Sequence, residues 1–443
     1  MKKSIIIILL LCGVLAQAQN KKWTLKECVV YALENNISVK QSELDIETAE
    51  INKKDAFGNF LPSLNASAGY TWSIGLNQDP VTFNAVNSTT RNFNGGVGSS
   101  VDIYGGLRNV NQLRRSNLQI LSSQYQLDNM KDNISLNVAN AFVQILFNKE
   151  QLKVALAQQE VTKQDIERTS ELVEAGSLPR GDLYEIQATL ASQEQLVVNA
   201  ENAILLSKIG LAQLLLLKDY ENFDIVDNEL EIPPTNILNE TPQSIFSKAK
   251  ESRYDIKIAE NNSEIAEYDL KIAKAGLQPS LSASYSFSSN YFTSELFDTP
   301  NFENQMSDNK SHNISLSLNI PIFNGFSARN NISRSRVNVE RTKFQLEQAS
   351  LDLETTVYQS FNDAKGALKA YEAASKTLVA RQEAFNYSQE RYNVGLLNSF
   401  DFNQSKNGLE AAQSEVIRTK YDYIFKLKVL EFYFGIPVTE LKF

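Results

Sequence analysis

Residues 61–67 read LPSLNAS and residues 278–284 read QPSLSAS, with their prolines 217 positions apart. A second matched pair, IYGGL at 103–107 and IFNGF at 322–326, lies 219 positions apart. A spacing that changes by only two over this distance is the signature of an internal duplication. The sequence therefore predicts two halves that contain the same elements in the same order.

Long helices dominate the expected elements. Ten prolines and 18 glycines in 443 residues are few, which disfavours a loop-rich β protein. The stretch 106–175 has no proline and would form a helix about 105 Å long. In the first structural repeat, 19–241, we expect a helix at 25–57, a strand hairpin at 61–104, the long helix 106–175 and a helix at 181–218. In the second, 242–443, we expect a helix at 242–275, a hairpin at 279–323, a long helix at 326–394 and a helix at 400–434.

Apolar and polar residues alternate in the predicted hairpins. The alternation has no exception over 63–75 and recurs at 280–287 and 313–322, whereas 93–103 fits more weakly. A period of two gives each strand one apolar and one polar face. The polar face consists mainly of Ser, Asn and Gly, with Asp102 as the exception.

These strands have two possible settings: a half-buried sheet of a soluble protein, or a membrane with lipid against the apolar face. Aromatic residues lie in or beside the strands, as a girdle at a membrane interface requires: Tyr70, Trp72, Tyr104, Tyr285, Phe287, Tyr291 and Phe323. The hairpin connections 76–90 and 290–311 are long and polar, and we expect them outside the cell, with the helices in the periplasm. The pattern favours an α+β membrane protein.

The N-terminus has the form of a secretory signal. Residues 1–18 contain Lys2 and Lys3, an apolar run at 5–11 and a small-x-small pattern at 16–18. The net charge of −9 argues against nucleic-acid binding. One histidine and two cysteines exclude a His/Cys metal cluster, and no phosphate-binding loop or nucleophile–base arrangement stands out. We expect an exported protein that is not an enzyme and binds no cofactor, metal or nucleic acid.

Four strands per chain cannot close a barrel by themselves. Closure is required in a bilayer, because an open sheet edge leaves unpaired backbone groups in hydrocarbon. Two chains would give eight strands, whose interior is filled by side chains, whereas three chains give twelve with room for water. A homotrimer would also arrange the long helices as a ring. Asn and Gln side chains that recur at helical spacing along 133–158 line either a water-filled lumen or an ordinary solvated face.

Several motifs resemble those of the TolC family of bacterial outer-membrane efflux proteins. They are WTLKEC at 23–28, ALENN at 32–36 and RYNVG at 391–395 with Asp401, all within the doubled layout. The resemblance implies a homotrimeric channel, with four strands per chain in a shared twelve-stranded β-barrel and a long α-helical periplasmic barrel. It also implies a passive exit duct in the outer membrane, completed by a periplasmic adaptor (membrane fusion protein) and an inner-membrane transporter.

The resemblance further implies a periplasmic gate near the two helix–helix turns. Asp401 matches a ring aspartate of the family, and Tyr392 with Asp182 matches a tyrosine–aspartate link between neighbouring helices. The match is incomplete, because Gln404 stands where the pattern can carry a second acid and Leu397 where it carries an arginine. The alternative role for both aspartates is helix capping, worth about 0.3–1 kcal/mol through the helix dipole.

The same two turns are candidate docking tips for the helical hairpin of the adaptor. A glycine just past a long helix suits a left-handed helix cap, and leucines are unusual in a solvated turn. The predicted contacts are Gly176, Ser177, Leu178, Gly395, Leu396 and Leu397. The alternative is that the leucines only close the end of the helix bundle.

The sequence favours a passive duct that carries small toxic compounds out of the cell. The same duct could serve type I protein secretion or metal export, and the sequence does not separate these. A rival of another class is a periplasmic coiled-coil scaffold or adaptor. An adaptor would have a lipoyl-like β-module between its helices and no whole-chain duplication, so the duplication favours the duct.

Overall fold

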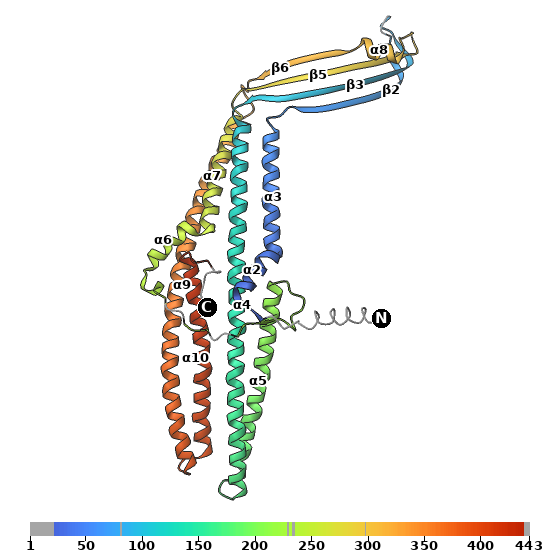
Figure 1. The fold of residues 1–443 in the computed structure, drawn as a ribbon. Helices are drawn as coiled ribbons and strands as arrows, with labels where there is room; N and C mark the ends of the chain where they lie inside the picture. Colours follow the sequence, from blue (N-terminus) through green and yellow to red (C-terminus); the bar gives the residue numbers. More distant parts are fainter. Residues whose placement is uncertain (1–21, 80–81, 228–229, 233–234, 297, 438–443) are drawn as a thin grey trace, which may run out of the picture. The chain divides into compact units, whose positions relative to one another are not determined.

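The computed structural model describes residues 22–79, 82–227, 230–232, 235–296 and 298–437, so the expected signal at 1–18 lies outside the described residues. Figure 1 shows the elements along the chain. They are β1 (Lys22–Trp23), α2 (Leu25–Asn35), α3 (Ile37–Gly58), β2 (Ser63–Gln78), β3 (Ala85–Gly105), α4 (Arg108–Glu174), α5 (Arg180–Leu214), β4 (Asp224–Ile225), η1 (Ile237–Asn239), α6 (Pro242–Ser252), α7 (Tyr254–Ala275), β5 (Ser280–Ser294), α8 (Phe302–Asp308), β6 (Ser311–Asn319), α9 (Ser327–Asn393) and α10 (Ser399–Tyr433). Within these described ranges, no helix has the length and apolar character needed to cross a membrane.

The chain forms two compact units. The sheet unit consists of Leu44–Gln124 and Lys257–Glu347, and the helical unit contains the remaining described residues. Each unit takes segments from both sequence halves, and the long helices α4 and α9 contribute residues to both. Neither sequence half is therefore a compact unit by itself.

The sheet unit contains one antiparallel sheet with the strand order β2-β3-β5-β6. Tyr70 lies opposite Phe93, Phe93 lies opposite Tyr291, and Tyr285 lies opposite Ile314. Directly opposed residues of antiparallel strands share a face, so the apolar residues of all four strands lie together. This apolar face is largely uncovered in the chain, and Ile314 is 83% exposed.

The strand bounds follow the alternation only in part. The segments 63–75 and 280–287 lie inside β2 and β5. The expectation of a long connection at 76–90 is wrong, because β2 reaches Gln78 and β3 begins at Ala85. The first residues of β3 do not alternate, and they form a strand because their backbone pairs with β2.

The second connection, 290–311, contains structure that its polar composition did not indicate. β5 continues to Ser294, and α8 lies beside it. The side-chain amide of Gln305 accepts a hydrogen bond from the Phe292 N–H (3.0 Å) and donates one to the Phe292 carbonyl (2.8 Å). β5 pairs with β6 only as far as Ser288, and beyond that point the Gln305 amide takes the place of the neighbouring strand.

Two expected helices are each broken once. The helix predicted at 25–57 divides into α2 and α3 at Asn36, and the helix predicted at 242–275 divides into α6 and α7 at Arg253. Both residues have extended backbone, with ψ of 132°. Asn36 accepts from the Ser38 N–H and donates to the Leu214 carbonyl (3.5 Å), so contacts made after folding stabilise the break.

Both long helices begin after the same backbone turn. Gly106 and Leu107 have φ of +64° and +63°, and Gly325 and Phe326 have +60° and +65°. Left-handed backbone costs a residue with a side chain about 1–2 kcal/mol. A Cβ at Gly106 would lie 2.6 Å from the Cβ of Gln278, so only glycine fits there. This shared turn supports the predicted duplication.

Candidate functional site

The turn between α9 and α10 is closed by backbone hydrogen bonds. Gly395 has φ of +73°, and the Leu396 N–H donates to the Arg391 carbonyl at 2.8 Å. This pattern satisfies carbonyls at the end of α9. At the start of α10, the Asn398 side chain accepts from the Asp401 N–H (2.9 Å) and donates to the Asp401 carboxylate (2.9 Å). Asp401 is exposed, and it takes part in a helix cap.

The turn between α4 and α5 has the same backbone and a different cap. Gly176 has φ of +69°, and the Ser177 N–H donates to the Leu172 carbonyl at 2.8 Å. Pro179 is the N-cap residue of α5 and makes no side-chain capping hydrogen bond. Asp182 lies in the first turn of α5, where the helix dipole stabilises a carboxylate.

Tyr392 lies between the two helix pairs of this end of the helical unit. Its ring stacks on Phe402, with centroids 4.5 Å apart. Burial raises the pKa of the Tyr392 phenol, the charge of Asp182 raises it further, and the neighbouring Thr169 hydroxyl opposes the shift. Within the described chain, the buried phenol oxygen has no partner at ordinary hydrogen-bond geometry. The structure thus brings Tyr392 within electrostatic range of Asp182 and binds Asp401 to Asn398.

The two predicted docking tips differ in apolar exposure. Leu178 and Leu397 are each half-buried, whereas Leu396 is 70% exposed. Val394 and Phe400 flank Leu396 and are also strongly exposed, although sequence reasoning did not select them. The sequence could have selected both residues, since each is an apolar residue close to a turn. The remaining predicted contacts, Gly176, Ser177 and Gly395, are exposed.

The stripe of Asn and Gln residues along α4 divides into two parts. Asn133, Asn137, Asn140 and Gln144 are exposed, whereas the residues that follow them, Asn148, Gln151 and Gln158, are buried or half-buried and hydrogen-bonded to neighbouring helices. The Gln151 amide donates to the Ser414 carbonyl (3.2 Å), and the Gln158 amide donates to the Gln413 side chain (3.1 Å). Asn148 is buried and donates to the Ala203 carbonyl. These three residues form a hydrogen-bonded seam between α4 and the helices α5 and α10, a role that neither sequence interpretation included.

Buried charges continue this seam, and the sequence analysis missed them. The Lys406 ammonium group is buried and lies 2.7 Å from the Asp165 carboxylate and 2.9 Å from the Thr162 hydroxyl. Glu410, one turn further along α10, accepts a hydrogen bond from Gln193 of α5 at 3.0 Å. Burial raises the pKa of Glu410, and the positive charge of Lys406 opposes this shift. α10 is therefore tied to both α4 and α5 through polar groups.

Most of the predicted aromatic girdle lies on the apolar face of the sheet. Tyr70, Trp72 and Tyr285 are exposed there, and Phe287 and Tyr291 are half-buried on the same face. Trp72 lies under the Arg91 guanidinium group. Tyr104 lies beyond a register shift near the end of β3. Phe323 follows β6, and its ring centroid lies 5.6 Å from that of Phe326. In the described ranges, no group of three or more His, Cys, Asp or Glu side chains is placed to hold a metal ion.

Comparison with known proteins gives consistent results. A family model described as outer membrane efflux protein matches residues 29–215 and 245–435. The chain is 23% identical over 428 residues to the outer membrane protein TolC of Escherichia coli, covering 93% of this chain and 81% of the relative. It is 25% identical over 403 residues to the pyoverdine export outer membrane protein OpmQ of Pseudomonas aeruginosa, covering 88% and 80%.

A solved structure shares the fold. The outer-membrane channel OprN matches with a TM-score of 0.79 at 18% identity, over 94% of this chain and 90% of that one. The likeness includes the strands and the long helices, since it extends over nearly the whole chain. The predicted α+β fold class is confirmed.

Proposed function

Because the chain belongs to the family of outer membrane efflux proteins, we propose that it forms the passive exit duct of a tripartite efflux system. The family places it in the outer membrane and assigns it to efflux. The observation that carries the proposal is a four-stranded sheet with one exposed apolar face, in a chain with two 67-residue helices. An uncovered apolar face of this extent is stable only when lipid or another apolar surface covers it.

Three copies complete the duct in this proposal. β2 and β6 are the edge strands of the sheet, and edges in a bilayer must be paired. When β6 of one copy pairs with β2 of the next, three sheets close a ring of twelve strands. The apolar face then meets lipid, the aromatic girdle lies at the interfaces, and the polar face lines a passage for water and cargo. The long helices extend into the periplasm.

Asp401, Tyr392 and Asp182 form the periplasmic gate in this proposal. Three copies of Asp401 would place exposed carboxylates around the axis, where they attract cations. The cap with Asn398 is compatible with this role, because Asp401 is exposed and the cap uses one of its carboxylate oxygens. Tyr392 and Asp182 are close enough to interact electrostatically, which supports a link that forms or breaks when the helices move.

The tips of the two helix pairs are the proposed contacts for the adaptor, which in turn binds an inner-membrane transporter. The exposed side chain of Leu396, with Val394 and Phe400, would enter an apolar site on the adaptor's helical hairpin. Leu396→Glu should abolish crosslinking to the adaptor. Val379→Glu is the matched control, since Val379 is equally exposed on α9 and is not among the proposed contacts. Normal crosslinking of the Leu396 variant would exclude this tip.

Small toxic compounds are the proposed cargo, with protein secretion and metal export as alternatives. One relative is named for pyoverdine export, so the family name does not select a single cargo. Deletion of the gene separates the three, because it should raise sensitivity to toxic organic compounds and leave secreted proteins and metal tolerance unchanged.

The duct itself is tested by fractionation and electrophysiology. The full-length protein should occur in the outer-membrane fraction, require detergent for extraction and migrate as a trimer. Reconstituted trimers should conduct ions across a planar bilayer. A protein that is extracted without detergent as single copies would refute the duct and favour the scaffold or adaptor.

A further inference from the structure

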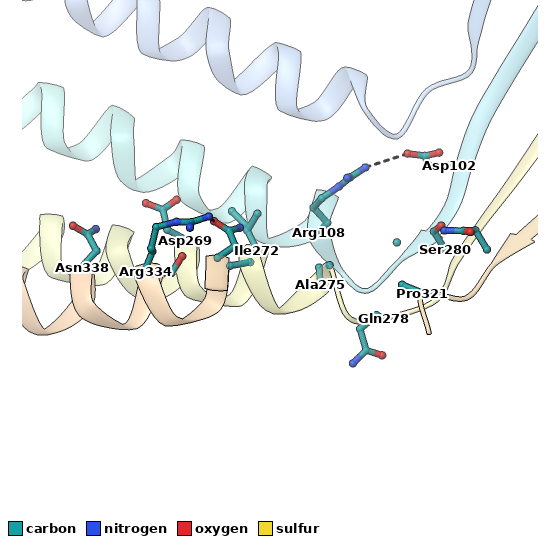
Figure 2. A pocket seen from close by; sticks show the side chains of 16 residues that line it. Asp102, Arg108, Asp269, Ile272, Ala275, Gln278, Ser280, Pro321, Arg334 and Asn338 are labelled. Atoms are coloured by element: carbon teal, nitrogen blue, oxygen red, sulfur yellow. Dashed lines mark hydrogen bonds and ion pairs between the residues drawn. The ribbon is translucent and has the colours of Figure 1, made fainter. Parts of the chain in front are cut away.

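A polar cavity of about 800 Å³ lies in the sheet unit, where the strands meet the helices. Its walls come from β3, β5, the end of β6, the start of α4, the end of α7 and the first turns of α9. Figure 2 shows Arg108 and Arg334 contributing to this cavity from different helices, with Ile272, Ala275 and Pro321 as apolar parts of its lining. The charged groups of its lining are two guanidinium groups, from Arg108 and Arg334, and two carboxylates, from Asp102 and Asp269, beside a partly apolar wall.

The cavity opens on the polar side of the sheet. Ser280 lines it and lies opposite Asn319, another lining residue. Positions 280 and 285 differ by an odd number, so Ser280 and the aromatic Tyr285 point to opposite faces of β5. If the proposed function is correct, the apolar face meets lipid and the cavity faces the passage through which cargo moves.

The segments at the starts of the two long helices have a charge opposite to that of the whole chain, and Asp269, one of the two lining carboxylates, is paired with Arg115, which does not line the cavity. The chain carries a net charge of −9, but residues 103–127 and 309–339 contain no Asp or Glu. Each of these segments includes the start of a long helix, where the backbone dipole is also positive. The helix starts that contribute to the cavity are therefore cationic in both side chains and backbone.

The two repeats differ in how their arginines are compensated. Arg115 and Arg334 are 219 positions apart and are equivalent in the duplication. Arg115 lies 2.6 Å from the Asp269 carboxylate. Arg334 has no carboxylate within ion-pair distance in the described chain, and its hydrogen-bond partner is the Asn331 side chain at 3.5 Å. Arg108 is paired loosely with Asp102 at 3.5 Å, and both side chains are half-exposed.

We propose that this cavity binds organic anions. Arg334 and Arg108 hold the oxyanion group, a carboxylate, sulfonate or phosphate, because guanidinium groups present several donors to such oxygens. Asn338 and Gln278 supply further amide donors, and Ile272 and Ala275 contact the apolar body of the ligand. This inference deepens the proposed function by naming a class of cargo that pauses at the junction of strands and helices.

Binding is tested on the full-length protein in detergent, by equilibrium dialysis with 2-naphthalenesulfonate. The cation (2-naphthyl)trimethylammonium has the same apolar body and is the chemical control. The wild-type protein should bind the anion saturably and the cation weakly. The double variant Arg108→Gln/Arg334→Gln should raise the Kd for the anion by about tenfold or more, since it removes the charge-assisted hydrogen bonds to the oxyanion.

Two further variants distinguish anion binding in the cavity from a nonspecific effect of positive charge. Arg329→Gln/Arg336→Gln removes the same number of charges from exposed positions of α9 that do not line the cavity, and should change Kd by less than about twofold. Asp102→Asn frees Arg108 from its carboxylate and should tighten anion binding. Equal binding of anion and cation, equal losses in both double variants, or no saturable anion binding would each overturn the site.

The inference and the proposed function fail in different ways. Dialysis does not require conduction. If the protein binds the anion through Arg108 and Arg334 but never conducts, the binding site is supported and the duct is refuted. If the protein forms a conducting trimer but does not bind the anion, the duct is supported and the binding site is refuted. In a conducting trimer, reversal potentials should show that the cavity double variant lowers chloride permeability relative to potassium more than the matched control does.

Discussion

The first and second repeats share a backbone plan and differ in the charges they bury. Asn36 and Arg253, 217 positions apart, each end a short helix in extended backbone. Asn36 stabilises its break with neutral hydrogen bonds. Arg253 is buried, lies 3.0 Å from the Asp132 carboxylate and rests on the ring of Phe432. The same break is therefore neutral in one repeat and ionic in the other.

The last helix of each repeat shows the same contrast. Lys406 and Glu410 of α10 correspond, 219 positions earlier, to Gln187 and Ala191 of α5. Gln187 and Ala191 are exposed, whereas Lys406 is buried in the seam with α4. The buried cations Arg253 and Lys406 come from the second repeat, and their carboxylate partners Asp132 and Asp165 come from the first. We expect substitutions in the second repeat to be more damaging and its stability to depend more on pH.

The largest difference is expected at the two helix breaks. Arg253→Met should destabilise the protein by about 3–5 kcal/mol, because it leaves Asp132 as a partly buried carboxylate without its cation. Asn36→Ala should cost about 1 kcal/mol, the net value of a neutral hydrogen bond. Loss of helical circular dichroism on heating and in denaturant measures both. Equal effects of the two variants would remove the contrast between the repeats.

Lys406→Met should have the next largest effect. It leaves Asp165 without its cation, but among the described residues Lys406 lacks the second carboxylate partner and the ring contact that Arg253 has, so we expect about 2 kcal/mol. Gln187→Met, the equivalent change in the first repeat, should lie within about 0.5 kcal/mol of wild type. The double variant Asp165→Asn/Lys406→Met should recover part of the loss. Additive losses in the double variant would show that the pair is not coupled.

The sequence predicted the strands better than the helix breaks, for a physical reason. β2, β5 and β6 each present one apolar face, so apolar and polar residues alternate along their sequences. No proline or glycine stands at Asn36 or Arg253, and each break depends on partners distant in sequence, such as Leu214 and Phe432. Local pattern contains no information about such partners.

The site residues divide in the same way. Glycines and capping residues mark the two turns in the sequence, so Asp182, Tyr392 and Asp401 could be placed near them. Lys406 and Glu410 could not be recognised, because their role depends on which face of α10 packs against α4 and α5. The seam formed by Asn148, Gln151 and Gln158 could not be separated from the exposed part of the Asn and Gln stripe, since neutral amides suit water and an interhelical hydrogen bond equally well.

A pH-dependent difference should follow from Glu410. Its pKa is raised in the folded state, mainly by burial, so the folded protein holds this proton more tightly than the unfolded chain. Ionisation therefore costs stability, and the cost grows as pH rises above the ordinary value near 4.5. Glu410→Gln removes the cost and should raise Tm at pH 7 by a few degrees, with a smaller gain at pH 4.5.

The matched control for this change is in the first repeat. Ala191→Gln places the same side chain at the equivalent, exposed position of α5, and should leave the pH dependence of Tm unchanged. An equal gain for Glu410→Gln at pH 7 and pH 4.5 would show that ionisation of Glu410 does not limit stability.

The smallest effect is expected at the caps of α5 and α10, and it separates capping from gating at Asp401. Asn398 and Pro179 are equivalent positions, but only Asn398 makes a side-chain cap. Asn398→Ala should cost about 1 kcal/mol, whereas Pro179→Ala should cost less because no capping hydrogen bond is lost. If Asp401 only caps α10, Asp401→Ala and Asn398→Ala should reduce stability similarly and leave single-channel conductance unchanged. If Asp401 also lines the gate, Asp401→Ala combined with Tyr392→Phe should raise conductance and weaken cation preference, while Asn398→Ala does neither.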